Sequence, residues 1–273
     1  MDIKKVKRDL KGFISQYRAN FVNLSKRESQ LLEIGALVLA AEHYRRQGFT
    51  VHLENLQKRR FRVKLGARGK PFNFSWYAIS RDDQRFEIHS NLCVAGAWND
   101  GGLYVIDVGV VNAGKLPADA DTPARREWKA MENKELITFV EAKKLVIYPM
   151  LMAQFYGIVH EIKPEFVDCS NANAPPEVHF YPSLVSVGYL YRISGLILEG
   201  FRKRGFRVNV IPTFDEKISQ VLSDPKTQSP FLPQLVEAVA PISASACVQE
   251  TQPYREDSTS NNSPAPTIPP NKA

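Results

Sequence analysis

Two strand-like segments, each interrupted by charge, constrain the fold of this chain more than any other feature. One runs from Leu103 to Val111 and the other from Glu135 to Leu145, and both are rich in β-branched and aromatic residues. That composition is typical of buried or half-buried strands. Asp107 stands alone among the apolar residues of the first segment. Because burying an isolated carboxylate is costly, such a group normally neutralises, pairs with a cation or binds a metal.

The second segment carries the charges that could partner Asp107. Glu141 and Lys143 are separated by Ala142 alone. Side chains alternate faces along a strand, so Glu141 and Lys143 project from one side and Ala142 from the other. An Asp on one strand beside Glu-Ala-Lys on the next predicts a cluster that could hold a divalent cation next to a phosphodiester. Its oxygen ligands would be the carboxylates of Asp107 and Glu141 and the backbone carbonyl of Ala142.

This combination, Asp107 followed by Glu141-Ala142-Lys143, resembles the active-site signature of the PD-(D/E)xK, or restriction-endonuclease-like, nucleases. The resemblance implies Mg²⁺ as cofactor, with Mn²⁺ as a substitute, and a Lys143 that positions the attacking water and stabilises developing charge. Hard oxygen ligands suit Mg²⁺, and a metal ion can polarise a phosphate and generate hydroxide. The sequence departs from the signature in having Ile106 before the Asp and a long polar segment, 112–134, between the two motifs.

Two further site residues are implied by the same resemblance. Glu33 lies on a helix predicted from Ser25 to Gln47, and some members of the family add a Glu from their first helix to the metal shell. The alternative is that Glu33 is a solvated helix carboxylate. Gln154 lies on a helix predicted from Pro149 to Ile162, where some recombination-type members carry Gln-x-x-x-Tyr. Ile158 replaces that Tyr here.

A basic run with interleaved aromatic residues lies between and after the predicted strands Phe49–Leu53 and Phe61–Leu65. The candidate nucleic-acid contacts are Lys58, Arg59, Arg60 and Arg62, and the aromatic residues are Phe61, Phe72, Phe74, Trp76 and Tyr77. Basic side chains bind phosphates, and aromatic faces can stack on unpaired bases. The alternative is a hairpin with a solvated basic rim and an aromatic core.

The remaining pattern predicts an α/β fold. The strand Phe86–Val94 should fold back on Leu103–Val111 as a hairpin. The helix Pro149–Ile162 followed by the strand Val178–Val187 predicts a parallel strand–helix–strand unit. A helix over 188–205 and a strand over 206–211 should follow, and then a helical stretch, Leu232–Val239.

The fold class implied is a restriction-endonuclease-like mixed β-sheet flanked by helices, over residues 25–240. Residues 1–24 are expected to form a basic N-terminal extension. Residues 241–273 are expected to form a disordered C-terminal tail, because Pro, Ser, Thr and Asn dominate there and large apolar residues are few.

Charge and cysteine content limit the classes of partner. The formal net charge of +7 favours polyanionic partners. The three cysteines are far apart without CxxC spacing, which favours reduced thiols in a cytoplasm over disulfides or structural zinc. No apolar run is long enough for a membrane span, and the first residues lack the apolar centre of a signal peptide. We therefore expect a cytoplasmic protein with no membrane partner.

The functional expectation is a metal-dependent nuclease that hydrolyses phosphodiester bonds, with DNA the favoured substrate and restriction, repair or anti-phage defence the roles that suit the family. It could act as a homodimer or as a subunit of a larger defence or repair complex. Two alternatives stay open. The chain could be a nucleic-acid-binding module that does not cut, or a structural subunit in which Asp107 merely pairs with Lys143.

Overall fold

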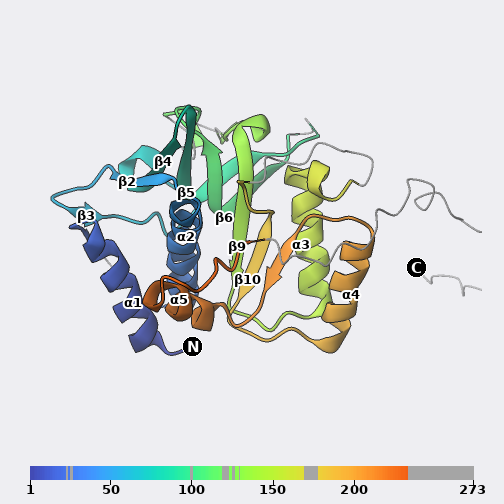
Figure 1. The fold of residues 1–273 in the computed structure, drawn as a ribbon. Coiled ribbons are helices and arrows are strands. Elements are labelled where there is room, and N and C mark those ends of the chain that lie inside the picture. Colours follow the sequence, from blue (N-terminus) through green and yellow to red (C-terminus); the bar gives the residue numbers. More distant parts are fainter. Residues whose placement is uncertain are drawn as a thin grey trace, which may run out of the picture. The chain divides into compact units, whose positions relative to one another are not determined.

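A seven-stranded mixed sheet with the order β11-β10-β9-β6-β5-β4-β2 forms the centre of the folded part of the chain (Figure 1). The computed structural model describes residues 1–22, 24, 27–98, 101–118, 123–124, 127–128, 130–168 and 178–232. The compact unit spans Met1–Glu237. The predicted tail over 241–273 lies outside the described residues, as does all of the predicted helical stretch Leu232–Val239 except its first residue.

The helices are α1 (Ile3–Gln16), α2 (Glu28–Arg46), α3 (Pro149–Ile162), α4 (Arg192–Lys203) and α5 (Phe214–Ser223). The strands of the main sheet are β2 (Thr50–Glu54), β4 (Trp76–Arg81), β5 (Gln84–Ala95), β6 (Leu103–Asn112), β9 (Leu136–Lys143), β10 (Ser183–Ser186) and β11 (Asn209–Ile211). Two short pairs lie outside it: β1 (Asn20–Phe21) with β3 (Arg60–Phe61), and β7 (Pro123–Ala124) with β8 (Glu127–Trp128).

The sheet changes from antiparallel to parallel at β9. Strands β2, β4, β5, β6 and β9 pair antiparallel in succession, whereas β10 is parallel to both β9 and β11. The predicted β5–β6 hairpin and the parallel unit β9–α3–β10 are therefore confirmed. Parallel neighbours require a crossover connection, and α3 supplies it.

Two apolar clusters hold the helices on the sheet. One contains side chains of α1, α2 and α5, such as Leu10, Leu37 and Ile218. The other contains side chains of α3 and α4, such as Phe155 and Leu198. Helix α2 is buried on nearly every side between residues 31 and 44, because α1 and α5 pack against the helix as well as the sheet. It is the central helix of its layer.

The first 24 residues belong to the compact unit and are not an extension of it. Val6, Leu10, Phe13 and Ile14 of α1 are buried in the same cluster as α2 and α5. Asp2 caps the helix by accepting a hydrogen bond from the backbone N–H of Lys5 at 3.0 Å. The charged residues between these positions make α1 look like a basic tail in the sequence, but their spacing leaves one apolar stripe that packs on the core.

Other boundaries differ from the predictions. The strand expected over Phe61–Leu65 consists only of the two-residue β3, and the strand expected over Phe72–Ile79 begins at Trp76 after a 3-10 turn over Pro71–Asn73. Helix α5 is not among the expected elements. None of the described helices combines the length and the apolar content needed to cross a bilayer.

Candidate active site

The candidate site lies where β6 and β9 separate. Their ladder ends at the pair Val108–Val140, although β9 continues to Lys143 and β6 extends back to Leu103. Beyond that pair, the backbone N–H of Ala142 donates instead to Oδ2 of Asp107 at 2.7 Å. A side-chain carboxylate thus takes the place of a ladder partner. We call this opening between the two strands the fork.

An interruption of the pleat in the neighbouring strand explains the fork. Ile88 packs in the α2-side cluster and Leu92 in the α3-side cluster, whereas residues four apart on a regular strand face the same side. Asn91 lies between them with φ at +51°, the left-handed region, and the ladder to β6 skips it between the pairs Ser90–Val108 and Leu92–Ile106, which flank Asp107. Asn is one of the few residues that tolerate this region. The distal half of the β5–β6 hairpin therefore turns away from β9.

Three predicted residues converge at the fork. Nζ of Lys143 donates to Oε2 of Glu141 at 2.7 Å and to Oδ2 of Asp107 at 3.3 Å. The three side chains range from 4% exposed for Glu141 to 16% for Asp107 and 36% for Lys143. We call these three residues the carboxylate–lysine cluster. The alternation of side chains along a strand predicted that these residues lie together, and the structure places them together.

Glu141 is the most constrained member of the cluster. Its Oε1 is buried and has no hydrogen-bond partner among the described residues. The backbone N–H of Asp107 lies near enough to lower the pKa of the Glu141 carboxyl, as does Lys143. Burial and the neighbouring charge of Asp107 outweigh both effects and raise that pKa to about 7. A buried acceptor without a partner is costly, so Oε1 is an open position for a cation or a donor.

Lys143 is protonated over the whole neutral range. Burial alone would lower its pKa, but the charges of Glu141 and Asp107 and the hydrogen bonds to both carboxylates raise the pKa well above its usual value. The side chain is therefore a fixed positive charge shared by two carboxylates. It is suited to stabilising negative charge and not to accepting a proton.

Glu33 lies beside the cluster, whereas Gln154 does not. Burial, followed by the charge of Asp107, raises the pKa of Glu33, while Asn91 and Lys143 oppose the shift. Oε2 of Glu33 accepts a hydrogen bond from Nδ2 of Asn91 at 3.2 Å. Gln154 is exposed on α3, and nothing in the described part of the chain links its side chain to the cluster.

Asn91 and Lys64 are site residues that the sequence reasoning missed. Nδ2 of Asn91 donates to the carbonyl of Lys64 at 3.1 Å as well as to Glu33. Nζ of Lys64, only 2% exposed as a residue, donates to the carbonyls of Asn91 and Ala67. For Asn91, the available signal was an Asn, a residue that tolerates the left-handed region, within a predicted strand. No feature of the sequence indicated that Lys64, one of several basic residues in this run, points inward.

Several oxygen atoms at the fork could serve as ligands of a hard divalent cation. It comprises two carboxylates, an open Oε1 on Glu141 and the backbone at Ala142. In a ladder, the N–H and C=O of one residue face the same neighbouring strand, so the Ala142 carbonyl faces the fork together with its N–H. Within the described residues, no group of three or more His, Cys, Asp or Glu side chains is close enough to hold a metal ion. Two carboxylates and a carbonyl are thus the available ligands, and Mg²⁺ often binds through one or two carboxylates plus waters and phosphate.

Comparison with known proteins identifies no relative. The chain matches no protein-family model, no curated protein and no solved structure at a significant level. The chemistry of the fork therefore carries the functional proposal.

The predicted nucleic-acid contacts form an exposed turn. Lys58, Arg59, Arg60 and Arg62 are all exposed, and none is within ion-pair distance of a carboxylate in the described structure. We call these four residues the basic turn. Lys58 and Arg59 have φ values of +52° and +61°, between the mutually hydrogen-bonded residues Gln57 and Arg60. Such a turn favours Asn-Gly, so two long cationic side chains occupy it against backbone preference.

The aromatic residues near the basic turn divide into two groups. Phe61 and Tyr77 are fully buried, with ring centroids 5.0 Å apart, and belong to the core. Phe72, Phe74 and Trp76 are only half-buried. The guanidinium of Arg62 lies over the Phe74 ring at 5.0 Å, a cation–π contact. Trp76 stacks on His89 at 5.4 Å, and Phe72 packs edge-on against Trp76 at 5.3 Å, so the rings of the second group contact other side chains.

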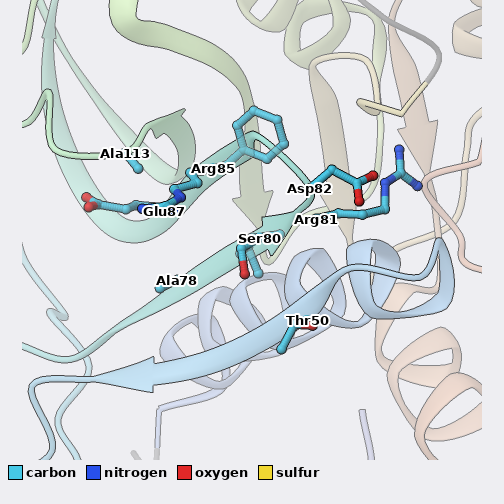
Figure 2. A pocket seen from close by; sticks show the side chains of 10 residues that line it. Thr50, Ala78, Ser80, Arg81, Asp82, Arg85, Glu87 and Ala113 are labelled. Atoms are coloured by element: carbon cyan, nitrogen blue, oxygen red, sulfur yellow. The ribbon is translucent and has the colours of Figure 1, made fainter.

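A pocket on another part of the sheet is separate from the cluster. Figure 2 shows it on β2, β4 and β5, where its lining includes Ser80, Arg81, Arg85 and Glu87. Its described lining residues include no member of the carboxylate–lysine cluster. The catalytic candidate is thus the fork at the strand ends and not this pocket.

Replacing Glu141 by Gln should stabilise the metal-free protein at alkaline pH. The pKa of Glu141 in the folded state is raised from 4.5 to about 7. The protonated Glu141 carboxyl therefore contributes its full stabilisation of the fold below pH 4.5. That contribution is lost as the pH rises through 7. The neutral amide avoids this loss, so the unfolding free energy should increase on the order of 1 to 3 kcal/mol at pH 8.5. Little should change at pH 4.5.

Thermal melting in EDTA at both pH values measures this effect. Glu199→Gln is the matched control, because Glu199 is exposed on α4. Wild type should gain stability from added Mg²⁺ and Glu141→Gln should gain much less. A lower melting temperature for Glu141→Gln at pH 8.5 would indicate that Glu141 serves only as a structural partner of Lys143.

Proposed function

We propose that this protein is a metal-dependent nuclease of the restriction-endonuclease-like type, with DNA as its favoured substrate. The order of elements supports the proposal: a helix carrying Glu33, then a β-meander carrying Asp107, a strand carrying Glu141 and Lys143, and a helix crossing to a parallel strand. A role in restriction, repair or anti-phage defence would suit such an activity.

One observation carries the proposal more than any other. Two carboxylates share a single ammonium at an opening between strands, and one carboxylate keeps a buried oxygen that has no hydrogen-bond partner among the described residues. A structural ion pair needs only one carboxylate for each cation. The excess negative charge and the open Oε1 of Glu141 are what a divalent cation would satisfy.

Each group at the fork has a separate role in the proposed reaction. Asp107, Glu141 and the Ala142 carbonyl would hold Mg²⁺ or Mn²⁺, which when bound supplies Lewis-acid polarisation of the phosphate and lowers the pKa of water. Lys143 stays charged, so its Nζ donates to a phosphate oxygen or to the attacking water and stabilises the charge that develops. Glu33, with its raised pKa, adds a carboxyl that can accept a proton near the cluster.

The basic turn is close enough to guide a substrate to the fork. Lys64 contacts Asn91, whose neighbours Ser90 and Leu92 pair with the residues on either side of Asp107. Lys64 follows Arg60 by four residues. That length of chain spans at most roughly 14 Å. Cations on the basic turn can therefore bind phosphates only a few nucleotides from the carboxylate–lysine cluster.

Replacing Arg59, Arg60 and Arg62 together by Ala should weaken nucleic-acid binding and flatten its salt dependence. Each lost phosphate contact lowers the slope of log K against log salt by about 0.9. Fluorescence anisotropy with a labelled duplex at several KCl concentrations measures the slope. A folded triple mutant with the wild-type slope would leave these residues as a solvated rim.

A second function is favoured by the ion pair itself. Lys143 and Asp107 are 3.3 Å apart, which would also suit a binding module or structural subunit that does not cut. The two proposals differ in the metal: only the nuclease should gain stability and activity from it.

Incubating the purified protein with plasmid, linear duplex and single-stranded DNA, and with single-stranded RNA, tests the proposal. Each substrate is given Mg²⁺, Mn²⁺ or EDTA. Cleavage that requires the metal supports the nuclease. Absence of cleavage on every substrate, with nucleic-acid binding retained, would support the non-cleaving module.

A further inference from the structure

Helix α1 presents a basic face to solvent that the proposed reaction does not use. Lys4, Lys5, Arg8 and Lys11 are exposed and Lys7 is half-buried. We call these five residues the α1 basic face. The apolar residues of α1 are buried against the rest of the compact unit, so the exposed side of the helix is charged and polar.

The charges of this face are unfavourable for the helix that carries them. The first turn contains no acidic residue, and Lys4 and Lys5 there oppose the positive end of the helix dipole. Lys4 and Arg8, and likewise Lys7 and Lys11, are like charges four residues apart, an arrangement that destabilises helices. Arg8 contacts Asp9 at 3.3 Å, and in the described structure no other member of the face is within ion-pair distance of a carboxylate. An external anion would relieve this repulsion.

The α1 basic face continues into the basic turn. Strand β1 follows α1 directly and pairs with β3, where the backbone N–H of Asn20 donates to the carbonyl of Arg59 at 3.0 Å. Arg18 is exposed between α1 and β1. Figure 1 shows the C-terminal end of α1 beside β3. The basic turn therefore adjoins the C-terminal end of α1.

We propose that this joint surface, the α1 basic face with Arg18 and the basic turn, binds the sugar–phosphate backbone of duplex nucleic acid flanking the cleaved bond. The inference rests on the proposed nuclease function. With 14 residues, α1 is about 21 Å long, which corresponds to roughly six base pairs of duplex. Phosphates along that length complement the row of like charges.

A membrane fits this surface less well than a duplex. A helix that binds lipid inserts its apolar face between the headgroups. Here Val6, Leu10, Phe13 and Ile14 are occupied by the core, and the described large apolar residues that are exposed include none on α1 or the basic turn. The surface offers cations without a large apolar side chain, which suits a polyanion in solution.

The test replaces Lys4, Lys5, Arg8 and Lys11 together by Ala and measures binding to a 30-base-pair DNA duplex in EDTA, where no metal-dependent cleavage interferes. The matched control replaces Lys115, Lys134, Lys203 and Lys226, which are exposed cations on other parts of the chain. The α1 variant should bind roughly tenfold more weakly or worse, and its salt slope should fall by up to about 3.6, from roughly 0.9 per lost contact. The control should keep nearly the full slope.

Folding and alternative partners are separated by two further measurements. The melting temperature of the α1 variant should equal or exceed that of wild type, because the substitutions remove repulsion from the helix. An unchanged slope, or an equal loss in the control variant, would overturn the inference. So would a variant that loses binding to phosphatidylserine vesicles while it keeps duplex binding.

The outcomes for this surface and for the nuclease are independent. Wild-type cleavage with an unaltered slope in the α1 variant would refute the surface and leave the nuclease. A reduced slope with no cleavage in Mg²⁺ or Mn²⁺ would support the surface and refute the nuclease.

Discussion

Asp107→Asn should abolish both metal binding and cleavage while the fold survives. The amide oxygen of Asn can still accept the hydrogen bond that the Ala142 N–H donates to Asp107 at 2.7 Å, so the fork keeps its backbone contact. A neutral amide is, however, a poorer ligand for a hard cation than a carboxylate. We expect cleavage to fall by more than roughly 100-fold, above the 10- to 100-fold that loss of an outer-sphere partner typically costs.

Calorimetric titration with Mg²⁺ and a plasmid-nicking assay measure the two effects on the same preparation. Asp83→Asn is the control, since Asp83 is exposed in the turn between β4 and β5. Metal binding by Asp107→Asn at wild-type affinity would remove Asp107 from the ligand set, even if cleavage were lost.

The location of the carboxylate–lysine cluster could be predicted because it depends on strand alternation and on the pairing of two strands that the sequence makes recognisable. Strand periodicity places Glu141 and Lys143 on one side of β9, and the antiparallel pairing of β6 with β9 brings Asp107 opposite them. The alternation of side chains operates over a few residues, whereas the pairing joins two strands that are distant in the sequence. The structure agrees with them in detail, down to the single ammonium that contacts both carboxylates.

The fork could not be predicted, because its cause is tertiary. Asn91 adopts a left-handed conformation within a strand and bonds to Glu33 on α2 and to the carbonyl of Lys64. The alternating apolar residues after Phe61 suggested a longer strand, but Lys64 turns inward to two backbone carbonyls instead. Only the assembled fold brings these groups together.

Helix α5 was predictable in principle. Phe214, Ile218 and Val221 recur at helical spacing and are all buried, and Asp215 and Glu216 lie in the first turn, where they favour the dipole. The basic residues of α1 obscured its apolar stripe in a similar way. In both helices the pattern was present, and the surrounding polar residues outweighed it.

Lys143→Ala separates catalysis from structure most sharply. The substitution removes the ammonium that contacts both carboxylates at 2.7 and 3.3 Å and leaves the carboxylates in place. Metal binding should survive or strengthen, because no cation then competes for them. Cleavage should fall roughly 100- to 1,000-fold, the scale of losing one group that stabilises charge in the transition state. Lys144→Ala, next in the chain and paired with Glu28 at 2.5 Å, should cut at nearly the wild-type rate.

The structural-pair alternative predicts a different result for the same variant. If Lys143 serves only to neutralise Asp107 and Glu141, its loss leaves buried charge unpaired and costs on the order of 3–5 kcal/mol. Magnesium would then not restore stability. In the nuclease, Mg²⁺ takes over the neutralisation, so the melting temperature of Lys143→Ala should recover when the metal is added. Two results together would show that the cluster is an ion pair and not a catalytic site. Lys143→Ala would melt far below wild type with or without Mg²⁺, and the wild-type protein would cut no substrate in Mn²⁺.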